Sequence, residues 1–254
     1  MATLELEPLQ ILTLLGAGAA AGFINTLAGG GSLLTIPALL FAGIPSTIAN
    51  ATNRVAVVMQ CTVATAQFRR RNVFELRESL PMLLPAFAGS IIGAFIAAEI
   101  DPAVVDIALA IVLVLMLATL FFRPADIAAS VSRRAPAPWL IIPVFFIIGL
   151  YGGFVQAGVG FLLILGINLL FGFDLVKTNA LKVLIVALYS LFALSIFAMY
   201  GQVMWLHGVT LGVGNVAGAL VGVRLAVKRG AAAVRWVIVA AVVLTVLKLF
   251  GAIG

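Results

Sequence analysis

The sequence predicts an all-α integral membrane protein, and three observations lead to this prediction. Of its 254 residues, 64% are hydrophobic and only 9% are charged, whereas soluble domains carry about 25% charged residues. Apolar stretches that approach the ~20 residues needed to cross a bilayer recur along the chain, for example at 102–122 and 203–223. The alternation of apolar and polar residues that marks membrane β-strands is absent, so the spans are expected to be helices.

Charge and composition narrow the function classes. The net charge is +6, but the basic residues gather in short loops between apolar stretches, which is typical of membrane proteins and not of nucleic-acid binding. The expected surrounding partner is therefore the lipid bilayer. The chain has one cysteine, Cys61, and one histidine, His207. We expect neither a disulfide within the chain nor a metal site built from cysteines, and we expect no cofactor.

Apolar length and helix-breaking residues divide the chain into elements. We expect about eight full transmembrane helices plus two short segments, each of which follows a glycine break. The full helices are expected at 9–27, 48–68, 80–98, 102–122, 139–156, 178–200, 204–225 and 232–250, and the short segments at 32–42 and 161–171.

The two halves of the chain resemble each other, which indicates an internal repeat. The stretch GFIN at 22–25 matches GFVQ at 153–156, and each is followed by a glycine cluster and a short apolar piece. Further on, the Thr-Asn pairs at 52–53 and 178–179 each open a long helix. The division that follows is a first transmembrane repeat at 1–124, a cytoplasmic linker at 125–138 and a second transmembrane repeat at 139–254.

Loop charges predict how the two repeats are oriented. The loop after the long helix of the first half is basic, with arginines at 69–71, whereas its counterpart at 201–207 has no lysine or arginine. The next loops show the opposite pattern, acidic near 99–106 and basic at 228–235. Equivalent loops are thus expected on opposite sides of the membrane, as in an inverted repeat. An inverted repeat needs an odd number of crossings in each half. If each short segment is a fifth crossing of its half, this condition is met and both termini lie outside.

The paired glycine breaks are the strongest functional signal. Glycine is unfavourable within helices, and irregular backbone at membrane depth survives only where protein buries it or water reaches it. Broken helices at matching positions of two halves mark substrate sites in transporters. The alternative is a glycine hinge that only permits close packing.

Polar and cationic residues accompany the breaks. Arg54 and Lys182 lie within otherwise apolar helices, where a charge indicates function. If they face the interior, with amides around them and no acid deep in any span, the site favours an anion. The alternatives are helix capping by the Thr-Asn pairs and extension of both cations to the headgroups. The candidate substrate site comprises Asn25, Thr26, Gly29, Gly30, Gly31, Ser32, Asn50, Thr52, Asn53, Arg54, Gln156, Gly158, Gly160, Thr178, Asn179 and Lys182.

Glycines also recur every four residues, at Gly89/Gly93 and at Gly214/Gly218/Gly222. Such spacing lets helices approach closely. The sequence leaves open whether these stripes pack helices within one chain or between two copies in a homodimer.

Three stretches of the chain resemble the sulfite exporter TauE/SafE family. They are GFINTLAGGGSLL at 22–34, ANATN at 49–53 and GGFVQAGVGF at 152–161. The second break departs from the family's triple glycine, because Val159 interrupts it. The resemblance covers nearly the whole chain and implies a multi-pass permease of the plasma (inner) membrane. Its implied substrates are small anions that contain sulfur, such as sulfite, sulfonates or sulfoacetate.

We therefore expect a secondary transporter for small anions that works by alternating access between two inverted repeats. A membrane-embedded enzyme would need a group of catalytic side chains within the membrane. With one histidine, one cysteine and no acidic residue deep in a span, the sequence does not offer such a group. A channel or a structural membrane subunit is the remaining alternative.

Overall fold

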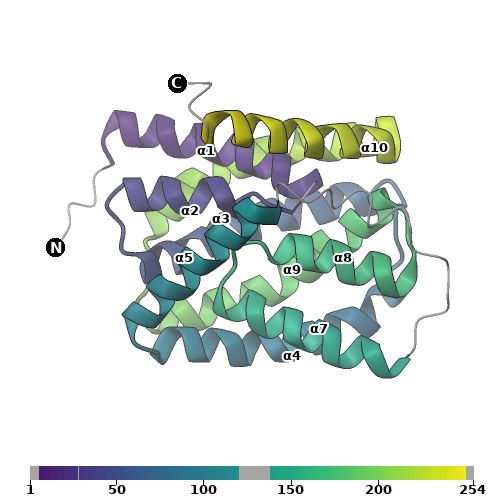
Figure 1. Ribbon diagram of the computed structural model, residues 1–254, viewed down its shortest axis with the longest axis horizontal. Helices are drawn as coiled ribbons and strands as arrows, with labels where there is room; N and C mark the ends of the chain where they lie inside the picture. The colour runs from purple at the N-terminus through teal and green to yellow at the C-terminus, as the bar shows by residue number, and fades with distance from the viewer. Residues whose placement is uncertain (1–5, 28, 120–137, 250–254) are drawn as a thin grey trace.

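The computed structural model describes residues 6–27, 29–119 and 138–249, and every regular element in these ranges is a helix (Figure 1). The predicted linker at 125–138 lies outside the described residues except for its last position. The helices are α1 (Pro8–Leu27), α2 (Ser32–Phe41), α3 (Ser46–Arg69), α4 (Leu76–Glu99), α5 (Pro102–Thr119), α7 (Pro138–Phe154), α8 (Val159–Phe171), α9 (Leu175–Met199) and α10 (Trp205–Leu249).

Four helices in the described part of the chain are long and apolar enough to cross a membrane. They are α1, α4, α9 and the stretch Trp205–Lys228 of α10. The predicted count of about eight full spans is therefore not established by length and composition. Helix α3 has 24 residues but is too polar to qualify, because it carries Asn50, Asn53, Arg54 and Gln60. All four of these side chains are buried inside the protein, so α3 does not need an apolar surface.

Both predicted glycine breaks are present, and the first one reverses the chain. Helix α1 ends at Leu27, and Gly29 adopts a φ of +89°, which favours glycine. Beyond the break, Gly31 lies against Ala21 and Asn25 of α1. At its other end, α2 places Leu39 in a buried cluster with Leu14 of α1. Helix α2 therefore runs back along α1.

The second break has the same form. Helix α7 ends at Phe154, and Gly158 precedes α8 with a φ of +75°. Val159, the first residue of α8, lies beside Gly152 near the end of α7, whereas Gly166 lies beside Ile148, one turn earlier in α7. Helix α8 thus also turns back along its predecessor, and in Figure 1 the two hairpins point toward each other from opposite ends of the molecule.

Helices α2 and α8 run back along α1 and α7, and the predicted odd number of crossings in each half stays a prediction. One difference from the sequence analysis concerns the predicted loop at 228–235, because α10 is one helix of 45 residues that continues through it. The residues at 226–235 are mostly alanine, lysine and arginine, which favour helix, with a single glycine among them.

Eight of the described helices assemble into two bundles that exchange one helix each, and α5 packs against α3. The first bundle consists of α1, α2, α3 and α10, and the second of α7, α8, α9 and α4; the closest packing is α1 along α10 and α4 along α7. Helix α4 comes from the first half of the sequence but packs in the second bundle, and α10 does the reverse. The two bundles meet mainly where α3 packs on α9.

The glycine stripes form the tightest of these contacts, and they do so within the chain. A Cβ on Gly89 or Gly93 of α4 would collide with the backbone of α7, and one on Gly214 or Gly218 of α10 would collide with the backbone of α1. Helices at such short separation gain close van der Waals contact. The stripes are therefore occupied inside the chain.

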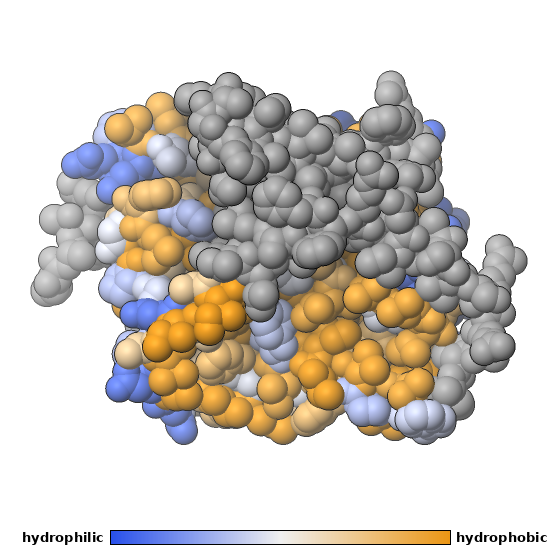
Figure 2. Space-filling view, in the orientation of Figure 1, coloured by the Kyte–Doolittle hydropathy of each residue, from blue (hydrophilic) through white to orange (hydrophobic). Residues whose placement is uncertain are grey.

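The surface suits a lipid environment. Figure 2 shows hydrophobic side chains over much of the lower half of the drawn face, with hydrophilic residues toward its left edge. Large apolar side chains point outward from several helices, among them Leu84, Ile107, Ile142 and Ile147. Apolar patches of this extent are unusual on soluble proteins and are typical of a membrane-facing surface.

Candidate functional site

The two helix breaks meet backbone to backbone at the centre of the molecule. A Cβ built on Gly160, at the start of α8, would lie 2.5 Å from both the Cα and the O of Gly29. A Cβ on Gly29 would likewise lie within 3 Å of the backbone of Gly160. Only glycine fits at this crossing, so the two breaks are parts of one structure.

Replacing Gly160 with alanine should lower both stability and transport. Overpacking at a site where backbone faces backbone costs about 1–3 kcal/mol, and the new methyl group would push the two breaks apart. We expect a lower melting temperature and at least a tenfold loss of transport. Gly16→Ala is the matched control, because nothing lies within 4 Å of its Cβ. Equal melting and transport by the two variants would contradict the close contact.

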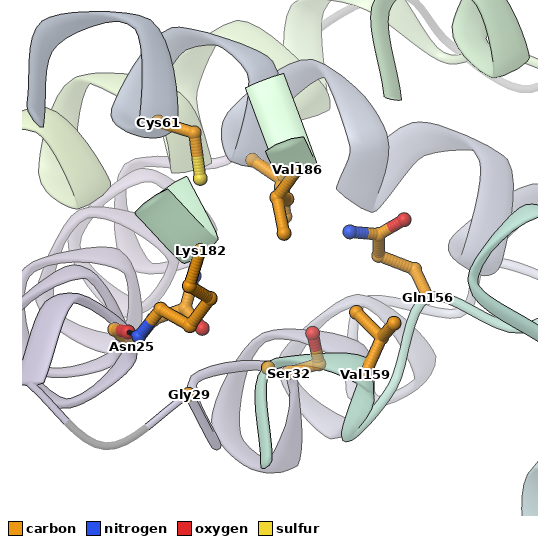
Figure 3. A pocket seen from close by; sticks show the side chains of 10 residues that line it. Asn25, Gly29, Ser32, Cys61, Gln156, Val159, Lys182 and Val186 are labelled. Atoms are coloured by element: carbon orange, nitrogen blue, oxygen red, sulfur yellow. Dashed lines mark hydrogen bonds between the residues drawn. The ribbon is translucent and has the colours of Figure 1, made fainter. Parts of the chain in front are cut away.

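A small cavity lies beside this crossing. Its volume is about 10 Å³, enough for the centre of one water molecule. Figure 3 shows the lysine side chain of Lys182 reaching across its edge toward Asn25, with Cys61 and Val186 on one wall and Ser32 and Val159 opposite. The lining residues are Asn25, Gly29, Ser32, Val57, Cys61, Gln156, Val159, Gly160, Lys182 and Val186.

Lys182 of α9 is fully buried and anchors the end of α1. Its Nζ donates to the O of Asn25 at 2.7 Å and to the O of Thr26 at 3.4 Å. It also donates to Oδ1 of Asn179, one turn earlier in α9, at 2.7 Å. A cation at the C-terminal end of a helix interacts favourably with the exposed carbonyl groups and the helix dipole.

Arg54 of α3 does the same for the end of α7. Its guanidinium donates to the O of Gly152 at 3.0 Å, to the O of Gly153 at 2.6 Å and to Oε1 of Gln156 at 2.9 Å. It also lies 4.8 Å from the centre of the Phe197 ring. Arg54 is fully buried but does not line the cavity. Neither cation extends to the headgroups.

The two cations act on equivalent places. Their carbonyl partners are the third- and second-last residues of each broken helix, at 25–26 in α1 and at 152–153 in α7. Each cation reaches from one bundle to the broken helix of the other: Arg54 belongs to the first bundle and Lys182 to the second. The cations thus tie the bundles together across the centre.

Amide side chains complete the polar region. Asn25 Nδ2 donates to Oε1 of Gln60, whose own Nε2 donates to Oγ1 of Thr26. Asn50 spans the second break, because its Nδ2 donates to the O of Phe154 and its Oδ1 accepts from the N of Gln156. These bonds satisfy polar groups that the breaks would otherwise leave unpaired in a buried region.

The predicted site residues divide into groups. Asn25, Gly29, Ser32, Gln156, Gly160 and Lys182 line the cavity. Thr26, Asn50, Arg54 and Asn179 hold the breaks by the bonds above, Asn53 donates to Oγ of Ser32, Gly158 turns the second break, and Gly30 and Gly31 are buried in the first.

Two predicted residues serve elsewhere. Oγ1 of Thr52 accepts from the N of Met204 before α10, and Thr178 donates to the O of Phe173 before α9. Five residues of the region were not among the predicted site residues: Val57, Cys61, Val159, Val186 and Gln60. Of these, only Gln60 has a signal in the sequence, because it is a polar residue about two turns beyond Arg54 in the same helix.

Acidic groups do not contribute to the centre in the part of the chain that the structure describes. The buried polar side chains there are hydroxyls, amides, one histidine and the two cations, without an aspartate or glutamate. No group of three or more potential metal ligands occurs among the described residues. Among the described residues, the buried centre therefore holds two basic side chains and no acidic one.

Comparison with known proteins gives a consistent family assignment. The family model described as "Sulfite exporter TauE/SafE" matches residues 14–249. The chain is 32% identical over 213 residues to the "Probable membrane transporter protein ORF9" of a Sinorhizobium species, which covers 83% of this chain and 81% of the relative. It is 31% identical over 233 residues to the "Probable membrane transporter protein YfcA" of Escherichia coli, covering 92% and 87%. No solved structure matches the chain.

Proposed function

Because the chain belongs to the sulfite exporter TauE/SafE family of membrane transporters, we propose that it is a secondary transporter for small anions. Its substrates in this proposal are anions that contain sulfur, such as sulfite, sulfonates or sulfoacetate, and its location is the plasma (inner) membrane. The observation that carries the proposal is the ammonium group of Lys182 on the wall of the central cavity.

The electrostatics of the cavity support an anion. Lys182 and Arg54 are buried and are balanced by carbonyl and amide oxygens rather than by carboxylates among the described residues. Buried charges are costly unless they are paired. An anion in the cavity would supply the missing negative charge and would gain charge-assisted hydrogen bonds from the site.

Alternating access fits the architecture. The cavity of about 10 Å³ has room for the centre of about one water molecule, so it is too small for a sulfonate group, which alone has one sulfur and three oxygen atoms. Helices must therefore move before a substrate can enter. We propose that the two bundles, related as inverted repeats, move relative to each other about the α3–α9 contact.

The inverted arrangement predicts opposite exposure of equivalent loops. In a Cys61→Ala background, Arg70→Cys follows α3 and Tyr200→Cys follows α9, at matching places of the two halves. An impermeant thiol reagent should modify the first only from the cytoplasmic side and the second only from the outside. Modification of both from the same side would contradict the inverted repeat.

The substrate class is tested by a binding screen with purified protein. Sulfite, ethanesulfonate, sulfoacetate, a sulfate ester, and sodium and ammonium salts of a bulky inert anion are compared by thermal shift and calorimetry. We expect saturable stabilisation by at least one of the sulfur oxyanions and none by the cations. Stabilisation by the cations alone would overturn the anion assignment.

A further inference from the structure

We propose that Lys182 holds the two bundles closed over the cavity, and that the transported anion opens them by replacing the carbonyl oxygens of α1 as the partner of this lysine. This inference rests on the proposed function for the identity of the anion. The closing contact itself is a property of the chain and can be tested without any substrate.

The contact joins parts that belong to different bundles. Lys182 extends from α9 in the second bundle, and two of its three acceptors, Asn25 O and Thr26 O, belong to α1 in the first. The third acceptor, Oδ1 of Asn179, lies on the same helix as the lysine. When the bundles separate, Lys182 and Asn179 move together and only the bonds to α1 are lost.

The substrate and the carbonyl groups of α1 compete for the N–H donors of Lys182. An ammonium group has three N–H donors and no more, and the structure gives Lys182 three oxygen partners. An anion that binds this lysine must therefore displace at least one of them. An oxyanion is the stronger acceptor, because its full negative charge attracts the ammonium group more strongly than the partial charge on a carbonyl oxygen does.

Arg54 differs from Lys182 in a way that assigns the two cations different tasks. It also joins the bundles, through Gly152 and Gly153 of α7, but it does not line the cavity. An anion in the cavity meets Lys182 first. Arg54 accordingly remains a fixed link at the second break while the link at the first break opens.

The accessibility of Cys61 reports this opening. Cys61 is its only cysteine, it is 1% exposed, and it lines the cavity beside Lys182. While the bundles are closed, a thiol reagent cannot reach it. The rate at which Cys61 is modified therefore measures how often the cavity opens.

The test compares Lys182→Gln with wild type in proteoliposomes that contain no candidate substrate. We expect a small methanethiosulfonate reagent to modify Cys61 at least tenfold faster in Lys182→Gln. Lys182→Arg keeps the positive charge, so its rate of Cys61 modification should remain within about threefold of the wild-type rate. If the lysine only filled space, the charge of the replacement would make no such difference. Lys182→Met removes the same bonds without burying a new polar group, and it replaces the glutamine variant if that variant does not fold. Wild-type rates in both neutral variants would overturn the proposal.

A second measurement tests release by the anion. Hydrogen exchange of the backbone at 24–31 should increase when sulfite or ethanesulfonate is added to wild type, and it should not respond in Lys182→Met. If neither anion raises this exchange, release by the substrate is wrong even when transport occurs. If Cys61 becomes accessible in the lysine variants but no anion is transported, the closing contact stands and the proposed function fails.

Discussion

Purified Lys182→Gln protein is expected to bind a sulfonate ten- to a hundredfold more weakly than wild type. The substitution removes a charge that lines the cavity, and a hydrogen bond to a charged group contributes about 1.5–3 kcal/mol. Calorimetric titration with the tightest sulfur oxyanion from the binding screen measures the loss directly.

The lysine variant needs a control for folding and for charge. Lys182→Arg retains the positive charge, so it should lose less affinity for the sulfonate than the glutamine variant does. Some loss is expected, because the planar guanidinium group differs in shape from an ammonium group. Thermal melts establish that both variants are folded. Wild-type affinity in a folded Lys182→Gln protein would show that this lysine does not contact the substrate.

Arg54→Gln is expected to act mainly on stability. Three acceptors, Gly152 O, Gly153 O and Gln156 Oε1, lose their buried charged donor. A loss of ~1.5–3 kcal/mol corresponds to a fall of roughly 3–12 °C in melting temperature for a chain of this size. Sulfonate affinity of the folded protein should change less than in Lys182→Gln.

Arg224→Gln provides the matched control for this prediction, because Arg224 is an exposed arginine of α10. Substitutions of exposed charges usually change stability by less than about 0.5 kcal/mol. If Arg54→Gln melts like Arg224→Gln, the guanidinium does not hold the end of α7.

The helix breaks could be predicted from the sequence because glycine carries its own signal. Gly29 and Gly158 both adopt positive φ, which few other residues tolerate, and each is followed by an apolar piece too short to span. The sequence left open whether Arg54 and Lys182 face the interior or extend to the headgroups, and the structure buries both.

The reversal of α2 and α8 could not be predicted in the same way. It depends on contacts between residues far apart in the chain, such as Leu14 with Leu39, and neither residue differs in type from a lipid-facing leucine. The same limit applies to the apolar wall of the cavity, where Val57 and Val186 carry no pattern that separates them from other valines. The sequence also placed both Arg54 and Lys182 in the candidate substrate site, because nothing in their sequence surroundings separates them. The structure places only Lys182 on the cavity wall.

The most direct test of the central claim, a carrier for small sulfur oxyanions, is counterflow in proteoliposomes. Vesicles are loaded with an excess of unlabelled sulfite or sulfonate, and the entry of a trace of the labelled anion is followed. We predict saturable, transient accumulation of label that Lys182→Gln reduces at least tenfold. Entry that does not saturate, together with an ohmic anion current, would contradict a carrier and favour a channel; no entry of any sulfur oxyanion would contradict the substrate class.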